Sequence, residues 1–132
     1  MKRYLSLGTL SLLLVLTGIT IAAERRGGWE LMGRQEVDFK GDHDRIEVGK
    51  REGRYRQLEF RVEGAPIEMY DMVVTFANGE TFKPKVRHRF AEGSGSHVID
   101  LPGDRRAIRR IDFHYRTINR REGKARVAVY GR

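Results

Sequence analysis

Residues 67–82 read IEMYDMVVTFANGETF, and this stretch carries the clearest structural signal in the chain. Its run from Ile67 to Phe76 is apolar on both faces apart from Glu68 and Asp71, which is typical of a central strand. Asn78-Gly79 follows, and an Asn-Gly pair tolerates the two positive φ angles of a type I′ turn between paired strands. The stretch therefore predicts a β-hairpin whose first strand lies inside an antiparallel sheet.

The same two-residue alternation continues on both sides of the hairpin. Turn residues interrupt it at intervals of about 8–12 residues, the pattern of an all-β sandwich or barrel. No stretch shows a helical period. We therefore expect an all-β fold: an antiparallel two-sheet sandwich, jelly-roll-like, of about eight strands, with a small barrel as the alternative. Ile111, Phe113 and Tyr115 are expected to point inward. Two sets are each expected to share one face of a strand: Leu31, Gly33, Gln35, Val37 and Phe39, and then Leu58, Phe60 and Val62. Further strands are expected around Ile46 and Val48, around Val98, Ile99 and Leu101, and around Ala125, Val127 and Val129.

The N-terminus has the three parts of a secretory signal peptide. Met1-Lys2-Arg3 is basic, residues 4–21 are uncharged and rich in leucine, and Ala22-Ala23 supplies small residues for cleavage. An uncleaved anchor is the alternative, because the uncharged segment is just long enough to span a bilayer. We expect cleavage after Ala22 or Ala23, a periplasmic or secreted protein, and a single β-sandwich domain over residues 24–132.

Composition narrows the classes of function. The length of 132 residues supports one domain. The absence of cysteine excludes a disulfide framework, a thiolate metal site, a catalytic thiol and a lipidated N-terminal cysteine. Residues 24–82 hold 10 basic and 13 acidic side chains, whereas residues 83–132 hold 14 basic and 5 acidic ones. Arginine suits the binding of phosphate or carboxylate, although a genome rich in G and C would also raise the arginine count.

The segment from Phe82 to Phe90 is the most informative candidate site. Its cations alternate with Phe82, Pro84, Val86, His88 and Phe90, so they are expected on one face of a strand, with His88 pointing inward. Pro84 indicates an edge strand. The cations either bind an anionic polymer or only prevent edge-to-edge aggregation. This basic stripe consists of Lys83, Lys85, Arg87 and Arg89.

Two further basic groups follow in the sequence. Arg105-Arg106 and Arg109-Arg110 flank the start of a strand, and Arg120-Arg121 lies in the loop before the last strand. The groups either converge on one anion-binding patch with the stripe or pair with nearby Asp104, Asp112 and Glu122 as surface ion pairs.

Metal and catalytic signals are weak. Asp42 and Asp44 flank His43 and could both reach a hard cation such as calcium, but Asp and Gly are also ordinary turn residues. His97 and His114 have no recognisable partner. Ser94 and Ser96 lie in a glycine-rich loop without the surroundings of a nucleophile. We expect no catalytic residue, no cofactor and no enzyme activity.

Several segments together resemble a known bacterial family. They are Trp29 to Gly33, Asp44 to Ile46, Ile67 to Phe76, Ile99 to Leu101, Ile108 to Tyr115 and Val127 to Gly131. In this order they are similar to the secreted family of unknown function that includes the enterobacterial protein YaaI. The resemblance implies a compact periplasmic domain and transfers no functional residue. The absence of cysteine and the high arginine content depart from the expected pattern.

The sequence favours a non-catalytic binding module for an anionic partner, namely an envelope glycan, lipopolysaccharide or an acidic protein. Nucleic acid is disfavoured, because Trp29 is the only tryptophan and no aromatic platform accompanies the basic stripe. The alternative is a structural or interaction domain of the envelope, in which the charges serve solubility and protect a sheet edge.

Overall fold

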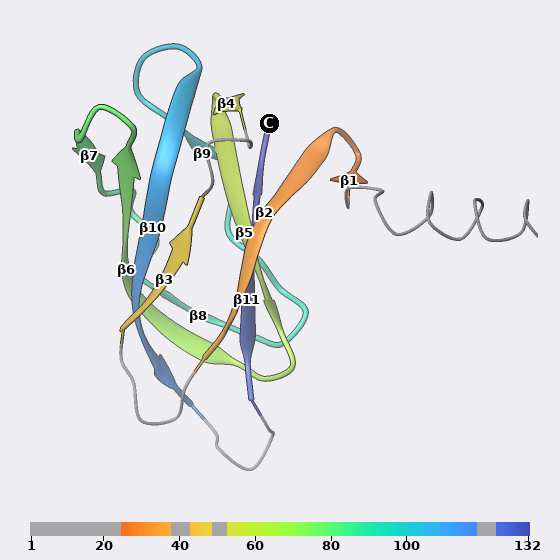
Figure 1. Cartoon of the computed structure of the whole chain (residues 1–132). Coiled ribbons are helices and arrows are strands. Elements are labelled where there is room, and N and C mark those ends of the chain that lie inside the picture. Colours follow the sequence, from red (N-terminus) through yellow and green to blue (C-terminus); the bar gives the residue numbers. More distant parts are fainter. Residues whose placement is uncertain (1–24, 38–42, 49–52, 119–123) are drawn as a thin grey trace, which may run out of the picture.

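A computed structural model describes residues 25–37, 43–48, 53–118 and 124–132. Their regular structure consists of β-strands, which form two antiparallel sheets (Figure 1). Within these ranges, no helix is long and apolar enough to cross a membrane. The expected signal peptide lies outside the described residues, and its cleavage stays a prediction.

The first sheet is built around the last strand of the chain. β11 pairs with β2 on one side and with β5 on the other, and all but the first of its residues are buried. The order is β1-β2-β11-β5-β9. The strands are β1 (Arg25–Arg26), β2 (Trp29–Glu36), β11 (Arg126–Gly131), β5 (Gln57–Glu63) and β9 (Ile99–Asp100).

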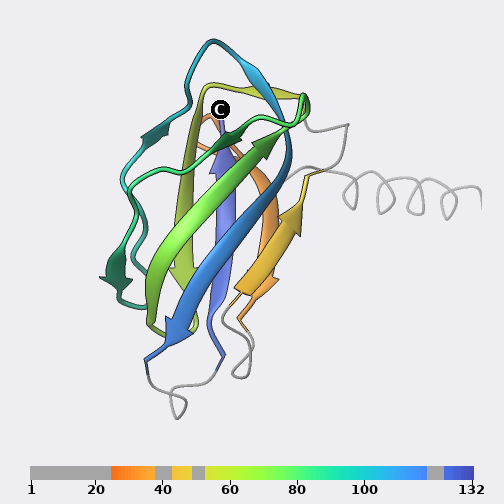
Figure 2. The ribbon, with the colours of Figure 1, turned by 90° about the vertical axis from the view of Figure 1, so that its left-hand side faces the viewer.

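The second sheet contains the expected hairpin. Its order is β3-β10-β6-β7, with β4 paired to one end of β10 and β8 paired to the start of β6. Figure 2 shows β3, β10 and β6 side by side. β6 has neighbours on both sides, which confirms it as a central strand. The strands are β3 (His43–Glu47), β4 (Arg54–Tyr55), β6 (Ile67–Phe76), β7 (Thr81–Phe82), β8 (His88–Phe90) and β10 (Arg106–Thr117).

The core lies between the two sheets. Phe60 of β5 and Phe113 of β10 meet edge to face, with ring centroids 6.2 Å apart. Alternate residues of both strands are buried, because successive side chains on a strand point to opposite faces. The two-sheet sandwich is therefore confirmed. The described residues form eleven strands, where about eight were expected, and four of them (β1, β4, β7 and β9) have only two residues each.

The inward face of β2 differs from the expectation. The register with β11 shifts at this point: Val129 pairs with Gly33, but Tyr130 pairs with Leu31. The extra residue, Met32, is buried with 6% of its surface exposed, whereas Leu31 is only half-buried. A bulge of this kind breaks the two-residue alternation, so the expectation that Leu31 shares a face with Gly33 is wrong. Phe39 lies outside the described residues. Val98 is exposed just before β9.

The hairpin after β6 is confirmed, but the predicted type I′ turn is wrong. Phe76 N–H donates to the Glu80 carbonyl over 2.8 Å, and Gly79 N–H donates to the Phe76 carbonyl over 2.9 Å. These bonds enclose a three-residue loop, Ala77 to Gly79, with Gly79 in the left-handed region at φ 92°. A three-residue hairpin loop needs one left-handed residue, and glycine takes this position at low cost.

Candidate functional site

The basic stripe lies between β7 and β8, along one edge of the second sheet (Figure 1). All four of its cations are exposed, as predicted, while Pro84 and Val86 are buried. Residues 83–87 form no regular strand, so the expected continuous strand over residues 82–90 is wrong. Pro84 has no N–H to donate to a neighbouring strand. His88 was expected to point inward, but it is exposed and meets the Phe90 ring edge to face.

The two outer cations of the stripe are paired with carboxylates of β6. Lys83 Nζ lies 3.5 Å from Asp71 Oδ2, and Arg89 Nε lies 3.0 Å from Glu68 Oε2. The hydrogen bond from Arg89 lowers the pKa of Glu68, against the opposing effect of burial. Both outer cations therefore have a carboxylate partner within the fold.

The two inner cations have different surroundings. Lys85 and Arg87 are exposed, and neither has a carboxylate within ion-pair distance among the described residues. The Arg87 guanidinium lies 5.3 Å from the centre of the Tyr70 ring, on the side that faces β6. Lys85 and Arg87 thus remain available to an external anion.

Lys85 and Arg87 also separate two clefts. A cleft of about 420 Å³ lies on the side of Tyr70, Asp71 and Lys83. A second cleft of about 350 Å³ has no acidic residue in its lining. We call this second one the stripe cleft. It is lined by Lys85, Val86, Arg87, His88, Phe90, Gly95, Ser96 and His97.

The second basic group does not join the stripe. The Arg106 guanidinium lies 3.8 Å from the centre of the Phe76 ring and donates to Glu80 over 2.6 Å. Arg109 donates to the Ala77 carbonyl over 2.8 Å. Arg110 lies on the outer sheet face, and Arg105 lines a separate cleft. Arg105 and Arg106 share the lining of one cleft, whereas Arg109 and Arg110 have other partners among the described residues. Arg120 and Arg121 lie outside the described residues.

The weak metal candidate gains no support. Asp42 lies outside the described residues, and Asp44 accepts a hydrogen bond from the hydroxyl of buried Tyr115. Within the described ranges, no three histidine, aspartate or glutamate side chains gather as metal ligands would. Asp44 instead links β3 to β10 through Tyr115.

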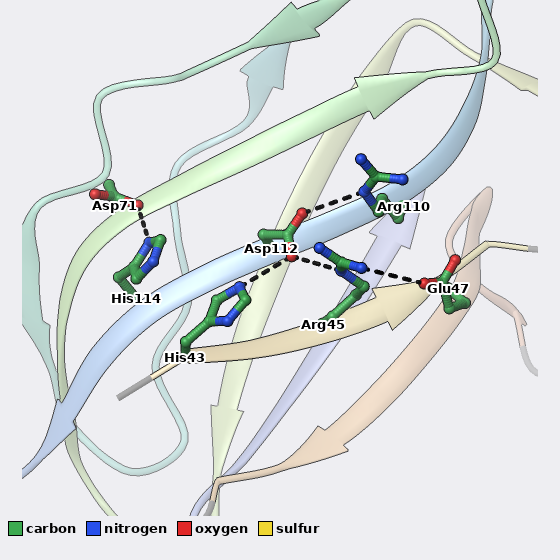
Figure 3. A network of polar contacts seen from close by, with 7 residues as sticks. All are labelled: His43, Arg45, Glu47, Asp71, Arg110, Asp112 and His114. Atoms are coloured by element: carbon green, nitrogen blue, oxygen red, sulfur yellow. Dashed lines mark hydrogen bonds and ion pairs between the residues drawn. The ribbon is translucent and has the colours of Figure 1, made fainter. Parts of the chain in front are cut away.

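A polar network covers the outer face of the second sheet (Figure 3). Asp112 of β10 accepts hydrogen bonds from His43 over 3.0 Å and Arg45 over 2.7 Å. The rings of His43 and His114 stack with centroids 4.7 Å apart, and His114 Nδ1 lies 2.6 Å from Asp71 Oδ1. Three strands therefore contribute to one chain of contacts.

Charges in this network set the protonation of its two carboxylates. Burial raises the pKa of Asp112, but hydrogen bonds from Arg45 and His43 outweigh it, and the net effect lowers that pKa. Asp71 behaves in the same way. Burial raises its pKa, but the contacts with His114 and Lys83 outweigh burial, and the net effect lowers that pKa. Both groups are therefore held as carboxylates.

Asp71 connects the network to the stripe. Its Oδ1 faces His114 and its Oδ2 faces Lys83. His114 has no recognisable partner in the sequence, because Asp71 and His43 reach it from other strands. The alternation of Arg110, Asp112 and His114 was the available signal, and it identifies a shared face without naming the partners.

Comparison with known proteins identifies the family. A family model described as "Domain of unknown function (DUF2541)" matches residues 9–131. The chain belongs to the DUF2541 family. The expected membership of an uncharacterised domain family is thus confirmed, while the likeness to YaaI stays a prediction.

Other comparisons add little to this DUF2541 chain. A search of curated proteins finds no match. Among solved structures, the chain is similar to a variant of CBM29-2, a family 29 carbohydrate-binding module, with 15% identity and a TM-score of 0.35 over 83% of this chain and 72% of the other. A second variant of that module, complexed with cellulohexaose, matches with the same identity and TM-score and 71% of its chain covered.

Proposed function

We propose that this DUF2541 protein is a secreted or periplasmic, non-catalytic module that binds an anionic partner of the cell envelope at Lys85 and Arg87. The partner is a polymer with repeated negative groups, such as an acidic glycan or the phosphorylated part of lipopolysaccharide. An acidic protein is a further anionic partner that the same surface would accept.

The contrast between inner and outer cations carries this proposal. Lys83 and Arg89 face carboxylates of β6, whereas Lys85 and Arg87 border the stripe cleft, whose lining holds no acid. An anion in that cleft meets two cations without displacing an internal partner. Arginine and lysine in such surroundings attract anions through charge-assisted hydrogen bonds.

The alternative role, protection of a sheet edge, also has an observation in its favour. The stripe follows β7 along an edge of the second sheet, and lysine on an edge discourages pairing with another chain. The two roles predict different results when the inner cations are removed.

The test uses the double variant Lys85→Gln/Arg87→Gln and heparin as the probe. We expect the fold to stay intact, because surface substitutions usually change stability by less than about 0.5 kcal/mol. Binding should weaken by about tenfold or more at low salt. Its dependence on salt should also flatten, because about two fewer counterions are released.

The matched control is Arg54→Gln/Arg126→Gln. Both residues are exposed, and they lie on β4 and at the start of β11, so the control removes two charges elsewhere. If both variants lost heparin binding equally, the loss would be explained by net charge alone, and the site at Lys85 and Arg87 would be refuted. Unchanged binding together with faster aggregation of the Lys85→Gln/Arg87→Gln variant would establish the edge-protecting role in its place.

A further inference from the structure

A further cleft of the described residues lies away from the stripe. It has a volume of about 590 Å³ and sits where β5 begins and β11 ends. We call it the terminal cleft. Its lining residues are Arg56, Gln57, Asp100, Leu101, Gly103, Asp104, Arg105 and Arg132.

The backbone on one side of this cleft is held firmly. Gln57 and Arg132 exchange two backbone hydrogen bonds of 3.0 Å, and Arg56 N–H donates to the Arg132 carbonyl over 2.8 Å. Leu101 N–H donates to the Arg56 carbonyl over 2.9 Å. The side chains of these residues therefore project from an ordered frame.

A relay of side chains crosses the same wall. The Arg132 guanidinium lies 4.4 Å from the centre of the Trp29 ring, and its Nε donates to Gln57 Oε1 over 2.8 Å. Gln57 Nε2 in turn donates to Asp100 Oδ1 over 2.8 Å. Among the described residues, the relay leaves the terminal N–H groups of Arg132 and the Asp100 Oδ2 atom for a ligand.

Other lining residues of the terminal cleft repeat this mixture of donors and acceptors. Arg56 lies 3.1 Å from Asp104 Oδ1, and both side chains are mostly exposed. Arg105 is exposed and has no ion pair among the described residues. The terminal cleft thus presents three guanidinium groups and two carboxylates within one small volume.

This mixture selects the chemistry of the ligand. A bare sulfate or phosphate would bind the guanidinium groups but would meet Asp100 and Asp104 as like charges. A neutral sugar would satisfy the carboxylates with its hydroxyl groups but would leave Arg105 and Arg132 without a counter-charge among the described residues. A sugar acid carries both groups: a carboxylate that a guanidinium binds through paired hydrogen bonds, and hydroxyls that donate to aspartate.

We propose that the terminal cleft is a binding site for a sugar acid, a hexuronate unit of an acidic glycan. Its volume lies in the ordinary range for small-ligand sites. The site is separate from Lys85 and Arg87, and it does not depend on the function proposed for the stripe.

The test measures binding of trigalacturonate to the mature protein by isothermal titration calorimetry. Maltotriose, which has no carboxylate, and inorganic sulfate, which has no hydroxyl, are the comparison probes. We expect trigalacturonate to bind at least about tenfold more tightly than either. Equal binding of maltotriose, stronger binding of sulfate, or no binding of trigalacturonate would overturn the proposal.

Two variants locate the site, and a third separates it from the stripe. Asp100→Asn removes an acceptor charge and Arg105→Gln removes a donor, both at exposed positions, and each should weaken trigalacturonate binding about tenfold or more. Lys85→Gln/Arg87→Gln should leave this binding unchanged. Tighter binding by Asp100→Asn would identify a simple anion site and refute the sugar acid. Loss in the stripe variant alone would place the ligand on the stripe and refute the terminal cleft.

Discussion

Arg45 Nε lies 2.7 Å from Asp112 Oδ1, and this contact joins β3 to β10 on the outer face of the second sheet. The hydrogen bond and charge of Asp112 raise the pKa of Arg45, while Arg45 and His43 lower the pKa of Asp112 against the effect of burial. Both shifts favour the charged pair. Asp112 is 8% exposed, so its charge depends on these partners.

Asp112→Asn should destabilise the protein at neutral pH by about 1–3 kcal/mol, because it weakens hydrogen bonds to a buried carboxylate. The folded-state pKa of Asp112 lies below its unfolded value. Its contribution is therefore complete above about pH 4, the ordinary value, and is lost as the pH falls through the folded-state pKa. Urea unfolding at a series of pH values should show the two proteins converging in acid.

Glu92→Gln is the control for this acid series, since Glu92 is exposed in the loop after β8. Its stability should follow that of the wild type throughout. Parallel curves for the wild type and Asp112→Asn down to about pH 2 would show that the network does not hold Asp112 ionised.

Gly33→Ala should destabilise the sandwich through a steric clash between sheets. A β-carbon on Gly33 would lie 2.6 Å from Cγ2 of Ile46, which is buried on β3. Overpacking of this kind costs about 1–3 kcal/mol. In an Ile46→Ala background the obstructing methyl group is gone, so the cost of Gly33→Ala should largely disappear. Additive effects in this double-mutant cycle would contradict the close approach.

Gly79→Val should destabilise the hairpin by more than about 1 kcal/mol, because a β-branched residue resists a positive φ. Gly79 has φ 92°, and a β-carbon there would meet nothing within 4 Å. The expected cost is thus conformational and not steric. Gly79→Asn is the matched variant, since asparagine tolerates this region, and it should cost less. Equal melting temperatures for Gly79→Val and the wild type would be incompatible with this loop geometry.

Export should remove the N-terminal segment. Mass spectrometry of the periplasmic or secreted fraction should find a chain that begins at Ala23 or Glu24, because the small residues before Glu24 suit the signal peptidase. Substitution of Ala22 and Ala23 by bulky residues should block this processing. A full-length chain that stays in the inner membrane would favour the anchor.

Local pattern was sufficient to predict much of the fold. Alternation in β5 and β10 placed Leu58, Phe60 and Val62, and likewise Phe113 and Tyr115, on the buried face. The glycine-containing turn after Phe76 marked the hairpin. These features depend on residues that are neighbours in the chain, where backbone geometry alone sets which side chains share a face.

Two-residue alternation did not predict the structure where the backbone is irregular. At Met32 a bulge exchanges the two faces of β2, and after Phe82 Pro84 interrupts the strand that alternation suggested. The Asn78-Gly79 pair indicated a turn but not its length, which the pairing of Phe76 with Glu80 decides. At Met32 and in the hairpin loop the register with a partner strand overrides the local pattern, whereas at Pro84 the missing N–H is the cause.

The sequence by itself determined the all-β class, the alternation that exposes the four cations of the stripe, and the excess of basic residues after Phe82. Only the tertiary structure decided which cations have internal partners. Lys83 and Arg89 meet carboxylates of β6, whereas the two inner cations do not. Gln57, Asp100 and Arg132 also come together, although they are far apart in the chain. The physical reason is that the side-chain period is a local property of the backbone, whereas charge pairing requires contact between strands, and the register of those strands is set by the packing of the whole sandwich.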